Sequence, residues 1–311
     1  MEKKVEVFIL SGFLGSGKTT LLQNILTQEK ELGRKVAVVM NELGQVSIDS
    51  NAVSENTPLK ELLNGCVCCT IQGQLEVHLQ GLLQEHDLDA IYIETTGVAH
   101  PIEVLDACMS PLFASQLFVQ SIVTLIDVNR WKERNSLSAQ LQMLLREQVR
   151  HADVLLLNKI DQLSEMEQGQ ILFEIQSINN EAKCLLTKHA AVKLNDLRKI
   201  TKADRKSHER THVHLDLKLK TYVHTFSNPL NVDLFEDWLR KMPDTIYRIK
   251  GYLKFTHSAN TYLFQYSYGT PIYMKELMNY KTTLVFIGEQ IDPNWMKAEM
   301  EKIEEESKKT G

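Results

Sequence analysis

The chain has 311 residues, of which 43% are hydrophobic and 24% charged, and its formal net charge at pH 7 is −5. The length is sufficient for two domains, and the composition is that of an ordinary globular protein. The modest negative charge argues against a nucleic-acid partner, and no apolar run approaches the ~20 residues that a membrane span requires. Because residues 1–4 lead into an apolar run without the pattern of a secretory signal, we expect a cytoplasmic location.

A strand predicted over Val5–Leu10 is followed by a glycine-rich loop and by a helix over Thr20–Leu32. The loop, GFLGSGKT, has the G-x-x-x-x-G-K-[ST] spacing of a phosphate-binding P-loop. Its glycines allow backbone N–H groups to point at phosphates, and the helix N-terminus adds partial positive charge. Lys18 is expected to reach the β- and γ-phosphates, and the Thr19 hydroxyl to ligate Mg²⁺. The nucleotide contacts predicted here are those of Gly12, Gly15, Ser16, Gly17, Lys18, Thr19 and Thr20.

The second predicted strand, Val36–Met40, is continuously apolar, as is typical of a strand covered on both faces. Glu42 follows at its carboxyl end, the edge where ligands gather in open α/β sheets. We therefore expect this carboxylate to face either the nucleotide or a metal ion, with a solvated loop residue as the alternative.

Three cysteines are crowded into four positions, at Cys66, Cys68 and Cys69. In a reducing compartment such crowding favours metal or redox chemistry over a disulfide framework. Thiolates suit Zn²⁺ and Cu(I) and also hold Co²⁺ or Ni²⁺. Three sulfurs leave one tetrahedral position, for which Glu42 is the first candidate and His100 the second. Packing in a core is the alternative, and we interpret the isolated Cys108 and Cys184 in that way.

A helix predicted over Ile71–Gln84 precedes a third strand, Asp89–Ile93, which ends in Glu94-Thr95-Thr96-Gly97. An acidic residue at the end of a buried strand, with a glycine after two intervening positions, fits the second nucleotide motif of P-loop proteins. We expect Glu94 to hold Mg²⁺ through water. The Gly97 amide is expected to sense the γ-phosphate and to release the loop after hydrolysis.

Two more buried strands are predicted, Ser121–Asp127 and Val154–Leu157, with a helix over Leu137–Val149 between them. The second runs into Asn158-Lys159-Ile160-Asp161, the N-K-x-D pattern of guanine recognition. Asp161 would accept hydrogen bonds from the ring N–H and the exocyclic amine of guanine, a donor pair that adenine lacks. Asn158 and Lys159 are expected to support this loop and to cover the base. The pattern therefore favours GTP over ATP.

A helix over Gln162–Asn179 and a strand over Ala182–Thr187 complete a predicted first domain, residues 1–194. Residues 195–212 form a polar, charged linker beside three histidines that either bind metal loosely or are simply exposed: His208, His212 and His214. Residues 213–311 indicate a smaller domain, with strands over 213–219, 246–255, 262–268 and 283–287 and helices over 232–242 and from 292 towards 309. The predicted fold class is α/β: a P-loop NTPase with a mostly parallel sheet and helices on both faces, followed by an α+β C-terminal domain.

The motifs GFLGSGKTT, NELG, GCVCCT, ETTG and NKID, in this order, resemble those of the CobW-like GTPase family, which includes zinc metallochaperones. The similarity continues at Tyr247–Gly251 and Val285–Gly288, so it covers nearly the whole chain. Leu43 and Thr96 stand where the family more often has Phe and Ser. The long histidine tract of many members is reduced here to three histidines, which argues against storage of several metal ions.

This resemblance implies a slow, metal-responsive GTPase that hydrolyses GTP to GDP and phosphate and delivers Zn²⁺, Co²⁺ or another metal to metalloprotein clients. We assign catalysis to Lys18, Thr19 and Glu94, and no general base is identifiable. The assigned metal ligands are Glu42, Cys66, Cys68 and Cys69 for the delivered ion and Thr19 for Mg²⁺. We expect γ-phosphate to order the Glu42 and Glu94 loops, and hydrolysis to relax them and change the metal affinity.

Four other functions are compatible with parts of the sequence. They are a metal-sensing GTP-binding regulatory module, a nickel-insertion accessory GTPase, a small-molecule kinase that uses ATP, and a redox role for the cysteines. The kinase leaves Asp161 unexplained, and Cys-x-Cys-Cys lacks the C-x-x-C spacing of thioredoxin-like sites. A homo-oligomer that depends on metal or nucleotide is also compatible with the sequence.

Overall fold

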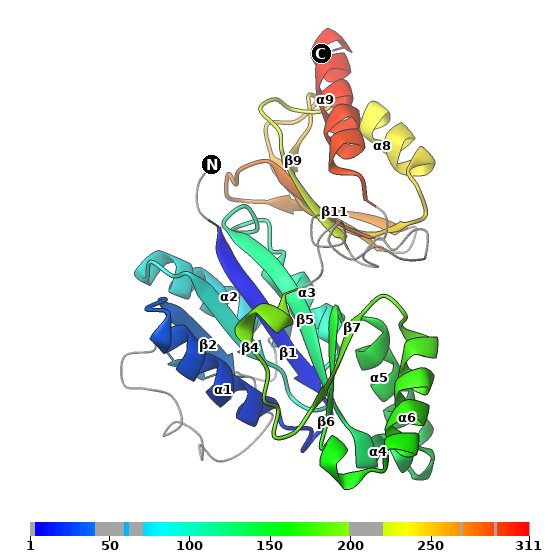
Figure 1. Cartoon of the computed structure of the whole chain (residues 1–311). Helices are drawn as coiled ribbons and strands as arrows, with labels where there is room; N and C mark the ends of the chain where they lie inside the picture. The colour runs from blue at the N-terminus through cyan, green and yellow to red at the C-terminus, as the bar shows by residue number, and fades with distance from the viewer. Residues whose placement is uncertain are drawn as a thin grey trace. The chain divides into compact units, whose positions relative to one another are not determined.

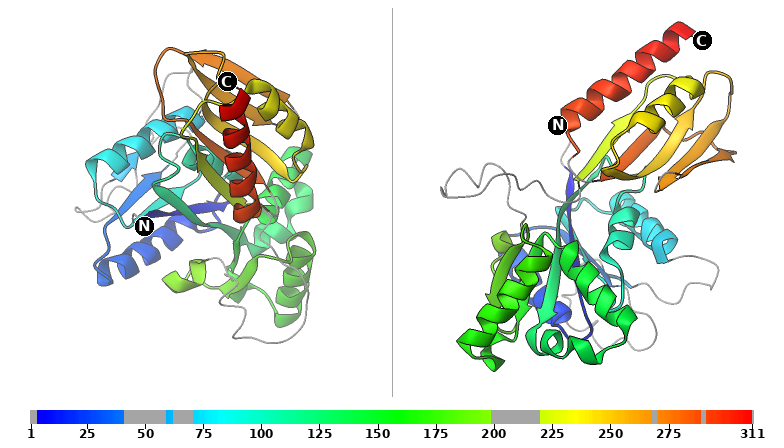
Figure 2. Two further views of the ribbon diagram at one scale, coloured as in Figure 1. Left: turned by 90° about the horizontal axis from the view of Figure 1, so that it is seen from above. Right: turned by 90° about the vertical axis from the view of Figure 1, so that its right-hand side faces the viewer.

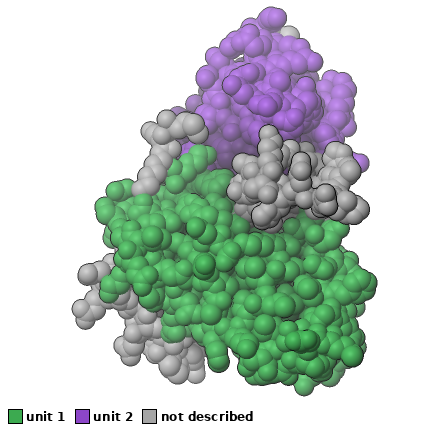
Figure 3. Space-filling view, in the orientation of Figure 1, with its two compact units in different colours: residues 1–108, 116–214 green, residues 109–115, 215–311 purple. Residues whose placement is uncertain are grey.

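The structure, a computed structural model, describes residues 4–40, 59–61, 71–198, 220–267, 270–288 and 291–310. The chain divides into two compact units, coloured separately in Figure 3: residues 1–108 with 116–214, and residues 109–115 with 215–311. Among the described residues no helix combines the length and the apolar character needed to cross a membrane.

The first unit is built on a seven-stranded sheet in which all neighbouring strands are parallel, in the order β3-β2-β4-β1-β5-β6-β7 (Figure 1). Its strands are β1 (Val5–Gly12), β2 (Val36–Met40), β3 (Leu59–Glu61), β4 (Ala90–Glu94), β5 (Leu117–Asp127), β6 (Val154–Asn158) and β7 (Lys183–Thr187). From β1 the chain crosses to β2 on one side, and from β4 it crosses past β1 to β5 on the other. The carboxyl end of β1 is thus a topological switch point, where open sheets of this kind bind ligands.

Helices cover both faces of this sheet (Figures 1 and 2). They are α1 (Lys18–Glu31), α2 (Ile71–Glu85), α3 (Pro101–Cys108), α4 (Val128–Lys132), α5 (Ala139–Arg150) and α6 (Glu165–Ile178), with short 3₁₀ turns η2 (Arg134–Ser136), η3 (Ile160–Gln162) and η4 (Leu194–Leu197). Strand β6 shows why its sequence is continuously apolar. Val154 and Leu156 pack with α1 and η4, whereas Leu155 and Leu157 pack with α5 and α6. A strand buried on both faces has no polar side to alternate with.

The second unit contains a five-stranded antiparallel sheet in the order β11-β10-β9-β12-β8. Its elements are β8 (Lys220–Thr225), α8 (Val232–Lys241), β9 (Ile246–Lys254), β10 (Thr261–Ser267), β11 (Thr270–Glu276), β12 (Thr283–Gly288) and α9 (Pro293–Thr310). Both helices lie on one face of this sheet (Figures 1 and 2). Their apolar residues, Phe235 and Trp238 on α8 and Met296 and Met300 on α9, form one core with the strands.

The fold class predicted from the sequence is confirmed, but several elements differ from the prediction. Strands β3, β8 and β11 and helices α3 and α4 were not predicted. Strand β11 is an edge strand whose residues are mostly exposed, so it lacks the alternation that identifies a half-buried strand. The strand predicted over 213–219 lies outside the described residues. The helix predicted over Gln162–Asn179 begins later, because Ser164 and Glu167 form a capping box at the start of α6.

The sequence places a linker at residues 195–212, of which 199–212 lie outside the described residues. The first positions of this segment belong to η4, where Leu197 is fully buried in the core beside α1. The domain limits taken from the sequence stay a prediction.

We predict that the core of the second unit depends on Phe235, which is fully buried and meets Phe264 edge to face at 5.1 Å between ring centroids. Phe235→Ala should lower the free energy of unfolding of this unit by about 3–5 kcal/mol, because it leaves a cavity among rigid neighbours. Phe173→Ala is the matched control, since that helical side chain is 74% exposed; its effect should stay within about 0.5 kcal/mol. Urea unfolding followed by circular dichroism measures both, and equal losses would contradict this description of the core.

Candidate nucleotide-binding site

The loop between β1 and α1 turns sharply at three glycines. Gly12, Gly15 and Gly17 have φ angles of +133°, +74° and +108°. Residues that carry a Cβ rarely adopt this region of backbone conformation. Space is limiting as well, since a Cβ on Gly12 would lie 2.3 Å from the Leu125 carbonyl oxygen. The backbone conformation therefore explains why glycine occupies each of these three P-loop positions.

Helix α1 begins at Lys18, so Thr19 and Thr20 lie in its first turn. The Lys18 side chain is buried, and its Nζ donates to the carbonyl oxygens of Gly12 at 2.8 Å and Phe13 at 3.3 Å. Burial lowers the pKa of the Lys18 ammonium, and the charge of Glu94 opposes this shift. The structure thus holds a cation inside the loop.

The P-loop threonine and the acidic residue at the end of β4 lie together. Thr19 Oγ1 donates to Glu94 Oε1 at 2.8 Å, although 75 positions separate the two residues. The contact follows from the sheet, because β1 and β4 are parallel neighbours with Leu10 beside Glu94. A hydroxyl and a carboxylate at this edge are oxygen ligands of the type that Mg²⁺ takes.

The segment after Glu94 packs against the P-loop on one side and α5 on the other. A Cβ on Gly97 would lie 2.5 Å from the backbone nitrogen of Leu14, so only glycine fits there. On the other side, Gln148 Nε2 donates to the carbonyl oxygens of Gly97 and Ala99, each at 3.3 Å. Sequence reasoning did not identify Gln148, because no local motif includes it.

The N-K-x-D residues at the end of β6 bind directly to the P-loop. Asn158 Nδ2 donates to the Ser16 carbonyl at 2.9 Å, and its Oδ1 accepts from the Ala190 backbone N–H at 2.9 Å. Lys159 Nζ donates to the Gly15 carbonyl at 3.0 Å. Asp161 lies in the 3₁₀ turn η3 with its side chain exposed. The structure therefore brings the predicted phosphate and base loops into contact.

Sequence analysis also missed the role of Asp127, which it treated only as the end of a strand. One of its oxygens caps α4 by accepting from the backbone N–H groups of Asn129 and Arg130. The other forms an ion pair with Lys159 Nζ at 2.6 Å. A signal was present, since Asp at a strand end followed by a short helix is a typical N-cap.

Most of the predicted metal ligands cannot be compared with the structure. Glu42, Cys66, Cys68 and Cys69 lie outside the described residues, as do His208, His212 and His214. Cys108 is fully buried and Cys184 is partly buried, and burial raises the pKa of both thiols, that of Cys184 to about 11. These two cysteines pack as apolar groups, as the sequence predicts.

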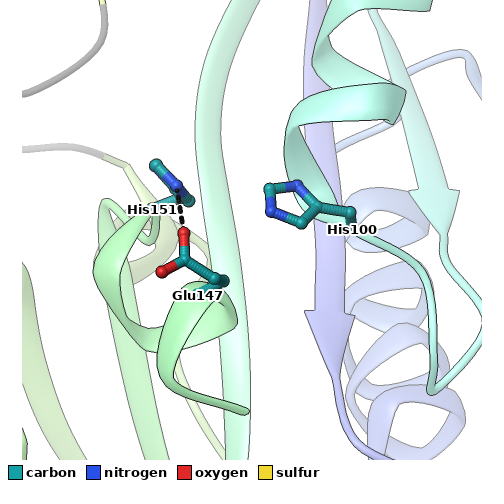
Figure 4. A group of neighbouring side chains, drawn as sticks. All are labelled: His100, Glu147 and His151. Atoms are coloured by element: carbon teal, nitrogen blue, oxygen red, sulfur yellow. Dashed lines mark hydrogen bonds and ion pairs between the residues drawn. The ribbon is translucent and has the colours of Figure 1, made fainter. Parts of the chain in front are cut away.

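His100, the second candidate for the fourth ligand, lies beside Glu147 of α5 and His151, the residue that caps this helix (Figure 4). The His100 and His151 rings are 5.6 Å apart between centroids. Burial lowers the pKa of His151, and the nearby Glu147 carboxylate partly offsets the shift. The clustered cysteines that His100 is expected to meet lie outside the described residues.

Two family models match the chain. The model described as CobW/HypB/UreG, nucleotide-binding domain, matches residues 6–186, and the cobalamin synthesis protein cobW C-terminal domain matches residues 219–304. The C-terminal match covers most of the second unit.

Curated relatives and one solved structure agree with these matches. The zinc chaperone YjiA of Escherichia coli is 33% identical over 61% of this chain and 59% of its own length. The zinc-regulated GTPase metalloprotein activator 1 of Dictyostelium discoideum is 31% identical over 63% of this chain and 48% of its own length. The chain thus spans about half the length of these relatives.

The solved structure is that of a zinc-bound triple mutant of the YjiA GTPase, which shares the fold with a TM-score of 0.50 and 24% identity over 97% of this chain and 99% of that one. Since the first family model covers more than half of the chain, this protein belongs to the CobW/HypB/UreG family.

Proposed function

We propose that this chain is a metal-binding GTPase that hydrolyses GTP to GDP and phosphate and delivers zinc to client metalloproteins. The observation that carries the proposal is the meeting of three sequence motifs at one sheet edge. Thr19 contacts Glu94, and Asn158 and Lys159 contact the backbone of the same P-loop. The P-loop would bind the phosphates, Thr19 and Glu94 the magnesium ion, and the N-K-x-D segment the guanine base.

The contacts within the P-loop are those expected of a site for a nucleoside triphosphate. The three positive-φ glycines form a backbone concavity, and Lys18 supplies a buried cation beside it. The Ser16 hydroxyl is buried and finds no hydrogen-bond partner within the described residues, which suits contact with a phosphate oxygen. The helix N-terminus of α1 adds donors and positive potential.

Guanine recognition is assigned to η3. An exposed Asp161 carboxylate beside Lys159 would accept from both guanine donors, while Asn158 and Lys159 keep this loop on the P-loop. Asp127 is a positioning residue, because its ion pair fixes the Lys159 ammonium.

During hydrolysis, Lys18 would move from the loop carbonyls to the β- and γ-phosphates and neutralise the charge that develops there. Thr19 and Glu94 would hold a magnesium ion, which would neutralise negative phosphate charge when bound. Gly97 lies against Leu14 of the P-loop, so its segment would respond to a γ-phosphate. With no general base assigned, slow turnover is expected.

The zinc part of the proposal rests on the family membership, on the relatives named as zinc chaperones and on the sequence of Cys66, Cys68 and Cys69. Three thiolates suit Zn²⁺, and Co²⁺ or Ni²⁺ are further ions of suitable type. We place the protein in the cytoplasm, where reduced thiols are available for metal. A homo-oligomer dependent on metal or nucleotide is part of the same proposal.

For guanine specificity, we predict that Asp161→Ala weakens GTP binding about 100-fold and leaves ATP binding unchanged. Two hydrogen bonds to a charged acceptor are lost, each with a net contribution of about 1.5–3 kcal/mol, and the lower end of this range for the two bonds together corresponds to roughly 100-fold. Asp87→Ala is the control, because that side chain is 84% exposed in a pair with Lys35. Competition against a fluorescent GDP measures the affinities, and unchanged GTP affinity in Asp161→Ala would remove the guanine assignment.

For hydrolysis, we predict that Lys18→Met lowers the GTP turnover rate about 100-fold, because loss of one transition-state donor costs about 2.7–4 kcal/mol. Lys35→Met serves as the control, since the Lys35 side chain is 68% exposed. Phosphate release at saturating GTP and Mg²⁺ gives both rates. A Lys18→Met protein that folds, binds GTP and turns over at the parent rate would show that the P-loop lysine is not catalytic.

A further inference from the structure

His100, Glu147 and His151 bring three metal-ligating side chains together outside the nucleotide loops (Figure 4). One ligand atom from each residue lies within 4.8 Å of the other two, and all three residues are partly exposed. His100 comes from the turn before α3, Glu147 from the last turn of α5, and His151 is the residue that caps the C-terminus of α5. The cluster therefore joins segments that are 47 or more positions apart in the sequence.

Glu147 and His151 are held together by the end of helix α5, where the His151 backbone N–H donates to the Glu147 carbonyl oxygen at 3.1 Å. The two residues are four positions apart, so their side chains lie on the same side of the helix end, with Glu147 Oε2 and His151 Nε2 at 3.0 Å. A tetrahedral ion with bonds of about 2.0–2.1 Å separates its ligand atoms by about 3.3 Å. The distance between Glu147 Oε2 and His151 Nε2 is therefore already close to the distance between two ligand atoms of such an ion. The second carboxylate oxygen accepts from Arg150 Nη1 at 2.6 Å, which orients the group.

Each imidazole can present Nε2 to a metal ion after its ring proton moves to Nδ1. In the metal-free chain His151 Nε2 faces the Glu147 carboxylate, which can only accept, so Nε2 carries the ring proton. Coordination through Nε2 would move this proton to Nδ1, which is buried and has no hydrogen-bond partner in the described part of the chain to oppose the change. His100 Nδ1 accepts from the Ile102 backbone N–H only at 3.3 Å. Coordination through His100 Nε2 would move the ring proton to Nδ1 and give up this long contact. A side-chain movement of about 1.5 Å closes the three ligands onto one ion at tetrahedral spacing.

We propose that His100, Glu147 and His151 form a thiolate-free site for a divalent transition-metal ion, with Zn²⁺ or Co²⁺ as the fitting ions. Two imidazoles and one carboxylate are a donor set that these ions accept, and water completes the coordination. The site differs in its ligands from the cysteine cluster, because it contains no sulfur.

An ion here would fasten the segment before α3 to α5. Gln148 already binds the carbonyls of Gly97 and Ala99 from the same helix, and His100 would add a second attachment. This consequence rests on the proposed function, in which the Gly97 segment responds to the γ-phosphate. Metal at the site would then favour one position of that segment and alter nucleotide affinity by the linkage between the two sites.

The test uses the full chain carrying Cys66→Ser, Cys68→Ser and Cys69→Ser, titrated with Co²⁺ alone and followed by visible absorption. We expect one bound ion with the intense d–d bands of four- or five-coordinate cobalt and no sulfur charge-transfer band. Adding His100→Ala or His151→Ala should weaken Co²⁺ binding at least tenfold, and Glu147→Gln should do the same. Circular dichroism and nucleotide binding verify that each variant folds.

Two controls decide between this site and other histidines. His86→Ala removes a histidine outside the cluster and should leave Co²⁺ affinity unchanged, as should His212→Ala with His214→Ala. Absence of the d–d bands in the Cys→Ser parent would overturn the site. Loss of binding in the His212 and His214 variant with full binding in His100→Ala would also overturn it.

The linkage is measured in the same Cys→Ser parent, by comparing Co²⁺ affinity with GDP and with a non-hydrolysable GTP analogue. A difference of threefold or more is expected. Equal affinities would contradict the coupling, whereas loss of Co²⁺ binding in His100→Ala would still establish the ligands. A chain that binds no guanine nucleotide would instead contradict the proposed function.

Discussion

The hydrogen bonds from Asn158 and Lys159 to the P-loop backbone are the contacts on which the rest of the site depends. Strands β1 and β6 are not neighbours, since β5 lies between them. Their loops lie at the same edge of the parallel sheet and are joined there by the hydrogen bonds of Asn158 to the Ser16 carbonyl and of Lys159 to the Gly15 carbonyl. Asp127 at the end of β5 holds the same Lys159 ammonium, so three strand ends are tied together. Lys159 adopts a φ of +66°, an unfavourable conformation for a residue with a Cβ that these contacts hold in place.

The contact between Thr19 and Glu94 adds the second constraint, on the other side of β1. Beyond Glu94, the Gly97 segment touches Leu14 of the P-loop, and Gln148 holds it to α5. A change at the phosphates therefore has a short path through packed backbone to α5 and to the His100 cluster. The proposed catalytic loops and the proposed metal ligands would be linked because they share this segment.

Local motifs made much of the site predictable. Three glycines with positive φ, the Thr19–Glu94 contact and the Asn158 and Lys159 contacts all involve residues that the sequence singles out. The spacing of residues within each motif follows from a strand and the turn or helix after it, which are short-range features of the sequence. The continuous apolar runs likewise predicted β2, β4 and β6, because those strands are buried on both faces.

The residues that sequence reasoning missed act through contacts between distant parts of the chain. Gln148 and Asp127 belong to no motif, and their partners lie 51 and 32 positions away. The spacing of Glu147 and His151 is visible in the sequence, but their meeting with His100 depends on how α5 packs beside the α3 turn. Edge strand β11 escaped prediction because solvent covers most of its side chains.

In the proposed function, guanine nucleotide and the delivered metal influence each other's binding. The most direct measurement is the Zn²⁺ affinity of the full chain, by chelator competition with Mg²⁺, in the presence of GDP and of a non-hydrolysable GTP analogue. If the two sites are coupled as proposed, the Zn²⁺ affinities in the two nucleotide states should differ about 5–150-fold, the range of typical coupling between two sites. Equal Zn²⁺ affinities in the two nucleotide states would contradict this coupling and leave a nucleotide hydrolase whose metal binding is independent.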